Sequence, residues 1–147
     1  MLSLRTMDPL SITASTLTVL SALETAFQLV KSYRDAPDQL DALGNEVADI
    51  TAAVTEVARV IRESRDKVHS SNDKASHLTL ALSKIRTKAS TLEALLRFCV
   101  NPPSLASGRA GVSRIAWLKV KSKVQKVQIE LRDGRLDLSI ALAAFTA

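Results

Sequence analysis

Apolar residues recur at helical spacing along the chain, most regularly in its second quarter. Between residues 40 and 61 they alternate in steps of three and four, at Leu40, Leu43, Val47, Ile50, Val54, Val57 and Ile61. This seven-residue repeat, sustained over three heptads, predicts a long helix that buries one narrow seam in left-handed packing. A third segment continues the same spacing at Leu78, Leu82, Ile85, Ala89, Leu92, Leu96 and Cys99. The fourth segment carries its seam at Trp117, Val120, Val124, Val127 and Leu131, extended by Leu138 and Leu142.

The first segment is less regular. Its apolar stripe is formed by Leu10, Leu17, Leu20, Phe27 and Val30, with Ile12, Val19, Leu23 and Leu29 close by. Small side chains also recur every four residues, at Ala14, Thr18, Ala22 and Ala26. Such a row permits close approach of a neighbouring helix.

Caps and helix breakers divide these four segments. Asp8-Pro9 and Asp35-Ala36-Pro37 are helix starts, because Asp caps free N–H groups and Pro tolerates the first turn. Pro102 and Pro103 end the third helix, and a Gly/Ser-rich loop follows them. We expect helices at about 8–34, 37–67, 72–100 and 113–145, forming an all-α, up-down antiparallel four-helix bundle of a single domain, 8–147. Residues 1–7 match no pattern and are expected to be a disordered N-terminal extension.

Composition agrees with a bundle. Hydrophobic residues make up 46% of the 147 residues, yet only one Trp, one Tyr and three Phe occur, so the core is expected to consist of aliphatic side chains and Ala. A single cysteine and the lack of a signal-peptide pattern indicate a reducing, cytoplasmic setting. The longest uncharged run near the N-terminus, residues 9–23, is too short and too rich in Ser and Thr to span a bilayer.

Candidate catalytic and metal-binding residues are few. His69 and His77 lack the i, i+4 spacing of a shared metal site, and Cys99 falls on an apolar seam, where a thiol usually packs as a small hydrophobe. Trp117 is in phase with its seam, which favours a core position over an exposed anchor. The acids of residues 35–49 fit a solvent-facing helix surface. We therefore expect a non-enzyme with no cofactor and no metal.

Charge is unevenly distributed along the chain. The net charge is +5, but residues 8–63 hold nine acids and four bases, whereas residues 109–135 hold eight bases and two acids. The basic strip consists of Arg114, Lys119, Lys121, Lys123, Lys126, Arg132 and Arg135. Such strips bind nucleic acid, anionic lipid or acidic partners, or only keep a helix hydrated. Without interleaved aromatic or amide readers, sequence-specific nucleic-acid recognition is not expected.

The segments Met7-Asp8-Pro9-Leu10-Ser11-Ile12 and Tyr33-Arg34-Asp35-Ala36-Pro37-Asp38-Gln39-Leu40 resemble the HeLo-like N-terminal domains of fungal STAND receptors, a class of NLR-like proteins. The resemblance continues through Phe98-Cys99 and Trp117 to the segment 136–142 and covers most of the chain. It implies a four-helix bundle related to the HeLo domain of the HET-S family and similar to the bundle of the mixed-lineage kinase-like necroptosis executioner.

The resemblance also implies a function. It predicts a membrane-targeting effector of cell death, innate immunity or heterokaryon incompatibility, held inactive by regulatory domains of the same polypeptide and recruited to the plasma membrane on activation. Its partners would be anionic lipid and further copies of itself. The residues that match the membrane-inserting helix are Leu10, Ile12, Leu17, Val19, Leu20 and Leu23. The alternative is a soluble interaction or autoinhibitory module that never contacts lipid.

Overall fold

The computed structural model describes residues 9–32, 38–63, 72–99 and 114–146. They form four long helices, α1 (Pro9–Ser32), α2 (Asp38–Glu63), α4 (Asn72–Phe98) and α5 (Arg114–Thr146), and these ranges contain no strand. The predicted all-α helical bundle is confirmed, and the helix bounds lie close to the expected ones. The expected disordered extension at residues 1–7 falls outside the described residues.

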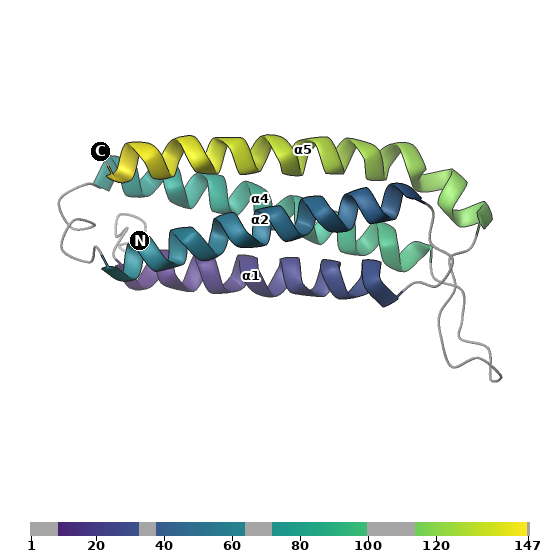
Figure 1. The fold of residues 1–147 in the computed structure, drawn as a ribbon, viewed down its shortest axis with the longest axis horizontal. Helices are drawn as coiled ribbons and strands as arrows, with labels where there is room; N and C mark the ends of the chain where they lie inside the picture. Colours follow the sequence, from purple (N-terminus) through teal and green to yellow (C-terminus); the bar gives the residue numbers. More distant parts are fainter. Residues whose placement is uncertain (1–8, 33–37, 64–71, 100–113, 147) are drawn as a thin grey trace, which may run out of the picture.

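The helices alternate in direction along the chain, as in an up-down bundle (Figure 1). Their order around the bundle is α1, α2, α5, α4, because α1 packs extensively on α2 and α4, α4 packs on α5, and α2 makes a smaller contact with α5. Helices α2 and α4, consecutive in the described part of the chain, therefore lie across a diagonal. As a consequence α1 runs parallel to its neighbour α4, and α2 runs parallel to its neighbour α5 (Figure 1).

The predicted seams of α2, α4 and α5 form most of the core. All seven seam residues of α2 and all seven of the third segment, including Cys99, are buried. On α5 the seam is buried from Trp117, which is 5% exposed, to Leu138, whereas Leu142 is only partly buried. Trp117 is thus a core residue, as its phase predicted. These aliphatic side chains supply the main driving force for folding.

The core face of α1 differs from the predicted stripe. Leu17 is 61% exposed, and Leu20 and Phe27 are only partly buried. The buried residues of this helix are instead Ile12, Thr16, Val19, Leu23, Ala26 and Val30. Their spacing is as regular as that of α2, but two of the positions hold Thr and Ala, which conceals the seam in the sequence. The Thr16 hydroxyl is satisfied in the core because it donates a hydrogen bond to the carbonyl oxygen of Thr13 at 2.7 Å.

Candidate functional site: the outward surface of α5

The residues predicted to engage the membrane do not share one surface. Ile12, Val19 and Leu23 are at most 1% exposed and belong to the core between α1 and its neighbours. Leu20 packs partly against this core, whereas Leu17 faces outward. The side chain of Leu10 lies outside the described part. In this conformation α1 is a structural helix, and its insertion into lipid would require that it leave the bundle.

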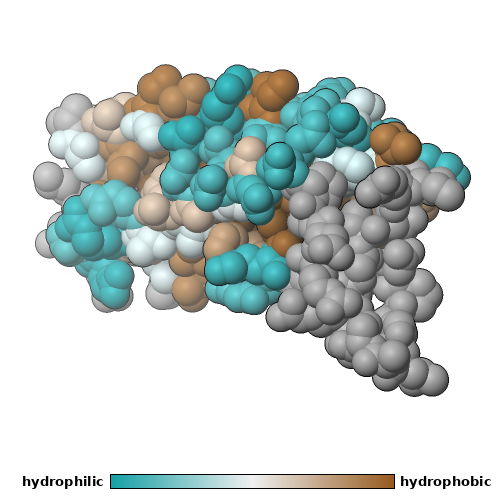
Figure 2. All heavy atoms as spheres, turned by 45° about the vertical axis from the view of Figure 1, so that its right-hand side comes forward, coloured by the Kyte–Doolittle hydropathy of each residue, from teal (hydrophilic) through white to brown (hydrophobic). Residues whose placement is uncertain are grey.

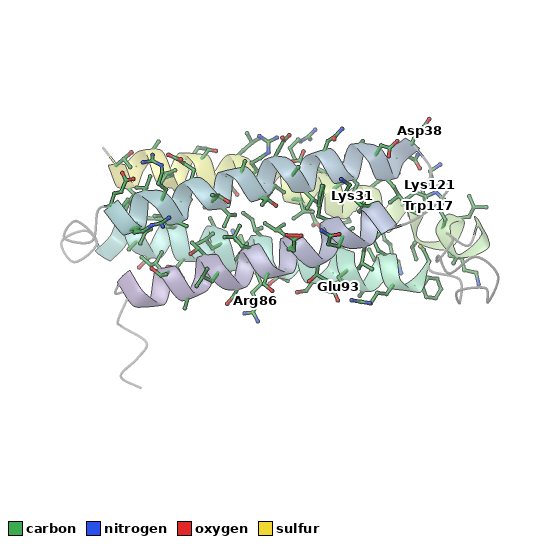
Figure 3. The ribbon with its side chains drawn as sticks, turned by 60° about the horizontal axis from the view of Figure 1, so that its bottom comes forward. Lys31, Asp38, Arg86, Glu93, Trp117 and Lys121 are labelled. Carbon is green, nitrogen blue, oxygen red and sulfur yellow. The ribbon has the colours of Figure 1, made fainter. Side chains whose placement is uncertain are left out.

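The row of small residues on α1 faces α4. Ala26 is buried, Ala22 is partly buried, and Ala14 and Thr18 line shallow grooves between the two helices. Seven of the residues lining these grooves are serines and threonines, and α4 contributes charged side chains at its edge. Arg86 and Glu93 lie along this side of the bundle (Figure 3). Ala22 and Ala26 thus pack into the bundle, whereas Ala14 and Thr18 are exposed beside α4 and leave a polar surface.

The basic strip is divided between two edges of α5. On the edge beside α2, Arg135 donates a hydrogen bond from Nε to Oε2 of Glu46 at 2.9 Å. This bond raises the pKa of Arg135 above its usual value. Arg132 is exposed and lines a groove with Glu46. Part of the predicted strip therefore serves packing between α2 and α5.

Two further members of the basic strip belong to the first turns of α5. Lys121 is partly buried and lies near Trp117, at the end of the bundle where α2 begins with Asp38 (Figure 3). Arg114 opens α5, but its side chain lies outside the described part. Lys121 stands two residues from both Lys119 and Lys123, a spacing that places it off the helix edge that those two lysines share.

The other edge of α5, beside α4, carries charges in a regular row. Its members follow one another in steps of four, three, four, three and four residues: Lys119, Lys123, Lys126, Glu130, Asp133 and Asp137. Residues at this spacing share one helix edge. The three lysines are exposed and make no ion pair with a described residue, whereas Glu130 pairs with Lys88 of α4 at 3.2 Å. We call this series the charged row; it is positive in its first half and negative in its second.

Between the two edges lies an exposed apolar face. Four large aliphatic residues project from it and are 67%, 51%, 50% and 69% exposed, respectively: Leu118, Ile129, Leu136 and Ile140. Figure 2 shows apolar side chains at intervals along the upper edge of the molecule, where Figure 1 places α5, separated by hydrophilic ones. The helix is thus apolar on two opposite sides, one in the core and one toward solvent. We call the second side the outward face.

The outward face was not predicted from the sequence. Its series is interrupted by polar residues at Ser122, Gln125 and Arg132, so the stronger core seam of the same helix concealed it. The detectable signal was an eleven-residue spacing from Leu118 to Ile129 and again to Ile140. Eleven residues are close to three helical turns, which keeps the positions on one side.

A shallow groove extends the outward face onto α4. Its volume is about 330 Å³, and Leu80 and Ala81 of α4 line it together with Ile140 and Ala141 of α5. Leu80 is itself 55% exposed, and His77 lies at the rim of the groove. Exposed apolar side chains that gather beside a groove in this way are typical of interaction sites.

Metal-binding groups and the thiol are the remaining candidates for chemistry. In the described ranges, no group of three or more His, Cys, Asp and Glu side chains is placed to bind a metal ion. Burial raises the pKa of the Cys99 thiol, which disfavours the nucleophilic thiolate. His69 lies outside the described residues. None of the four described helices combines the length and apolar character needed to cross a bilayer.

Comparison with protein-family models, with curated proteins and with solved structures finds no match to this chain. Its function is therefore inferred from the arrangement of its own residues, above all the outward face of α5 and the charged row beside it.

Proposed function

We propose that this chain is a signalling domain that acts by associating with other proteins, and that the outward face of α5 is its docking surface. The observation that carries the proposal is four aliphatic side chains, each at least half exposed, on one face of a bundle whose core is already filled. Water-exposed apolar area of this extent is stabilised when a partner covers it. The resemblance to HeLo-like domains of fungal STAND receptors supports a role in cell death or immunity, in cis with regulatory domains.

The burial of α1 favours this proposal over the insertion of that helix into lipid. Each buried Val, Leu or Ile side chain contributes about 1.5 to 3 kcal/mol to stability. Extraction of α1 would expose Ile12, Val19 and Leu23 together, and it would remove the packing surface of α2 and α4. An association surface that is already exposed on α5 requires no such rearrangement.

A membrane-targeting effector is the second candidate, because one observation favours it. The three lysines of the charged row, which make no ion pair with a described residue, lie along α5 in the interval between the exposed side chains of Leu118 and Ile129. Cations next to apolar groups suit an anionic membrane surface. Each lysine near such a surface contributes about 1 kcal/mol. In this case α5 would contact the membrane first, and recruitment to the plasma membrane would follow activation.

Inducible expression in a fungal cell tests the proposed function. The chain is fused to a domain that clusters on addition of a small molecule, and growth and viability are recorded. Clustering of the wild-type chain is expected to arrest growth, and Ile129→Glu together with Leu136→Glu is expected to abolish the arrest at equal protein level. Ala52→Glu, at an exposed position of α2, is the matched control and is expected to retain it. Growth unaffected by clustering of the wild type would contradict a signalling role.

A further inference from the structure

The outward face of α5 is nearly symmetric about Ile129. Leu118 lies eleven residues before Ile129 and Ile140 lies eleven residues after it. Ser122 and Leu136 stand seven residues before and after it, so a small side chain on one side corresponds to a large one on the other. Seven and eleven residues are close to two and three helical turns, and all five positions therefore share one face. When the helix is reversed end to end, Leu118, Ile129 and Ile140 come to the heights of Ile140, Ile129 and Leu118, respectively.

The charged row, unlike the outward face, changes sign when the helix is reversed end to end. Its lysines all precede Glu130 and its aspartates all follow it, along a single edge of the helix. Reversal of the helix end to end therefore exchanges positive for negative charge along this edge. Neither Asp133 nor Asp137 makes an ion pair with another described residue, although both lie beside α4.

From these two symmetries we propose that a second copy of this chain docks on the outward face of α5, with the two α5 helices antiparallel about a two-fold axis at Ile129. This inference rests on the proposed function, since it names the partner of the same docking surface. Around that axis the two Ile129 side chains meet. Leu118 faces Ile140 of the second copy, and Leu136 faces Ser122 of the second copy, so a large side chain opposes a small one seven residues from the axis on either side.

The charges favour antiparallel over parallel α5 helices in the dimer. A two-fold axis perpendicular to both helices keeps the α4 edge of one copy beside the α4 edge of the other. Lys123 and Lys126 then lie within about 3 Å along the helix axis of the height of Asp133 of the second copy, as does Lys119 relative to Asp137. The axis repeats each contact. A two-fold axis parallel to the helices would instead place the charged rows of the two copies on opposite sides of the contact, so that the lysines of one copy would not meet the aspartates of the other.

The size of the contact sets the expected strength. The stretch from Leu118 to Ile140 spans about 33 Å of helix, and one pair of helices buries less surface than the 1,200 to 2,000 Å² that is typical of stable complexes. We therefore expect a weak dimer that forms in the micromolar range or when copies are held together. Such an affinity suits a switch that operates on clustering of a larger polypeptide.

Sedimentation equilibrium of the whole chain tests the inference with two variants. The lysine-reversed variant combines Lys119→Glu, Lys123→Glu and Lys126→Glu, and the acid-reversed variant combines Asp133→Lys and Asp137→Lys. All five side chains are exposed, and both variants are expected to fold, with circular dichroism and thermal melting as the check. Each variant alone is expected to raise the dimer Kd at least about tenfold, since attraction becomes repulsion at both repeats.

An equimolar mixture of the two variants gives the decisive measurement. In a mixed dimer the introduced glutamates face the introduced lysines at one repeat, and the native lysines face the native aspartates at the other. The mixture is therefore expected to dimerise as the wild type does. The matched control carries Lys31→Glu, Arg62→Glu and Arg86→Glu, which are exposed cations of other helices, and it is expected to leave the dimer Kd unchanged.

Two outcomes overturn the inference. One is a wild-type chain that stays monomeric up to about 1 mM, the concentration at which even a binding free energy of only about −4 kcal/mol is detected. The other is a mixture that remains as monomeric as its components. Growth arrest that is lost in Ile129→Glu/Leu136→Glu, in a chain that is monomeric, would retain the proposed function and reject the second copy. Dimerisation of a chain that does not arrest growth would retain the second copy as partner and reject the proposed signalling function.

Discussion

The side chain of Ile85 on α4 packs directly against the backbone of Gly134 on α5. A Cβ atom added at residue 134 would lie 3.1 Å from Cγ1 of Ile85, closer than ordinary van der Waals contact. Gly44 of α2 has a similar relation to Val30 of α1, with a distance of 3.3 Å. Both glycines stand inside helices, where glycine costs about 1 kcal/mol relative to alanine. Their position at two antiparallel helix contacts explains why this cost is tolerated.

Replacing Gly134 with valine is expected to destabilise the bundle. The branched side chain overlaps Ile85, and overpacking of this kind costs about 1 to 3 kcal/mol. Urea unfolding measures the loss. In the background of Ile85→Ala the same change is expected to cost less, because the truncated residue leaves room. Ser139→Val, at an exposed position of α5, is the control, and strictly additive effects of the two substitutions would contradict the contact.

The hydrogen bond between Arg135 and Glu46 gives a second prediction. The Glu46 side chain is only 12% exposed, so Arg135→Met would leave a largely buried carboxylate without its partner. We expect a loss of about 1 to 2 kcal/mol in the free energy of unfolding. Arg59→Met is the matched control, because Arg59 and its partners Glu56 and Glu63 lie at the surface, and it is expected to change the melting temperature little. Equal losses in both variants would contradict this prediction.

The positions of Leu17 and Leu23 on α1 separate lipid contact from stability. Leu17→Glu places a charge at a side chain that is 61% exposed, and we expect a change in unfolding free energy of less than about 0.5 kcal/mol. Leu23→Ala removes a fully buried side chain and is expected to cost about 2 to 5 kcal/mol. Thermal and urea unfolding compare the two. Unfolding of the bundle by Leu17→Glu would mean that the face of α1 assigned to the core is wrong.

The fully buried thiol of Cys99 is expected to react slowly in the folded chain. Burial excludes the reagent and raises the pKa of Cys99, so less thiolate is present at a given pH than in a free cysteine. Reaction with a chromogenic disulfide reagent at pH 8 is expected to be at least about tenfold slower in the native chain than in urea. The native rate is expected to rise with pH over a higher pH range than the rate in urea does, because a thiol with a raised pKa forms its thiolate at higher pH. Equal native and unfolded rates would contradict the burial of this thiol.

How far the sequence predicted the fold depended on the residues at the seam positions. In α2 every seam position holds Leu, Val or Ile, and the pattern identified the core face without error. In α1 the same spacing passes through Thr16 and Ala26, so the apolar count favoured a face that includes the exposed Leu17. The diagonal placement of α2 and α4 could not be predicted, because periodicity identifies the buried face of a helix and not which neighbour covers it.

Only part of the candidate site was predicted, because the sequence shows which residues are charged and not which helix edge or neighbour each one faces. The lysines of the charged row were identified as cations on the last helix, but the acids that share their edge of α5, Glu130, Asp133 and Asp137, were not grouped with them. Arg135 was grouped with them because of its charge, although it pairs with Glu46 across a helix contact. Such a contact between residues 89 positions apart leaves no signal in a single sequence.

Vesicle binding distinguishes a membrane surface from a dimer surface, because the two respond oppositely to one variant. Anionic vesicles are expected to bind the wild type more tightly than neutral vesicles do if the lysines contact lipid, at about 1 kcal/mol per cation, and added salt is expected to weaken the binding. The lysine-reversed variant would lose binding. The acid-reversed variant would bind anionic vesicles more tightly, since it gains positive charge on the same edge, yet it would dimerise less. Equal binding of all variants to both vesicle types would reject a membrane role for the charged row.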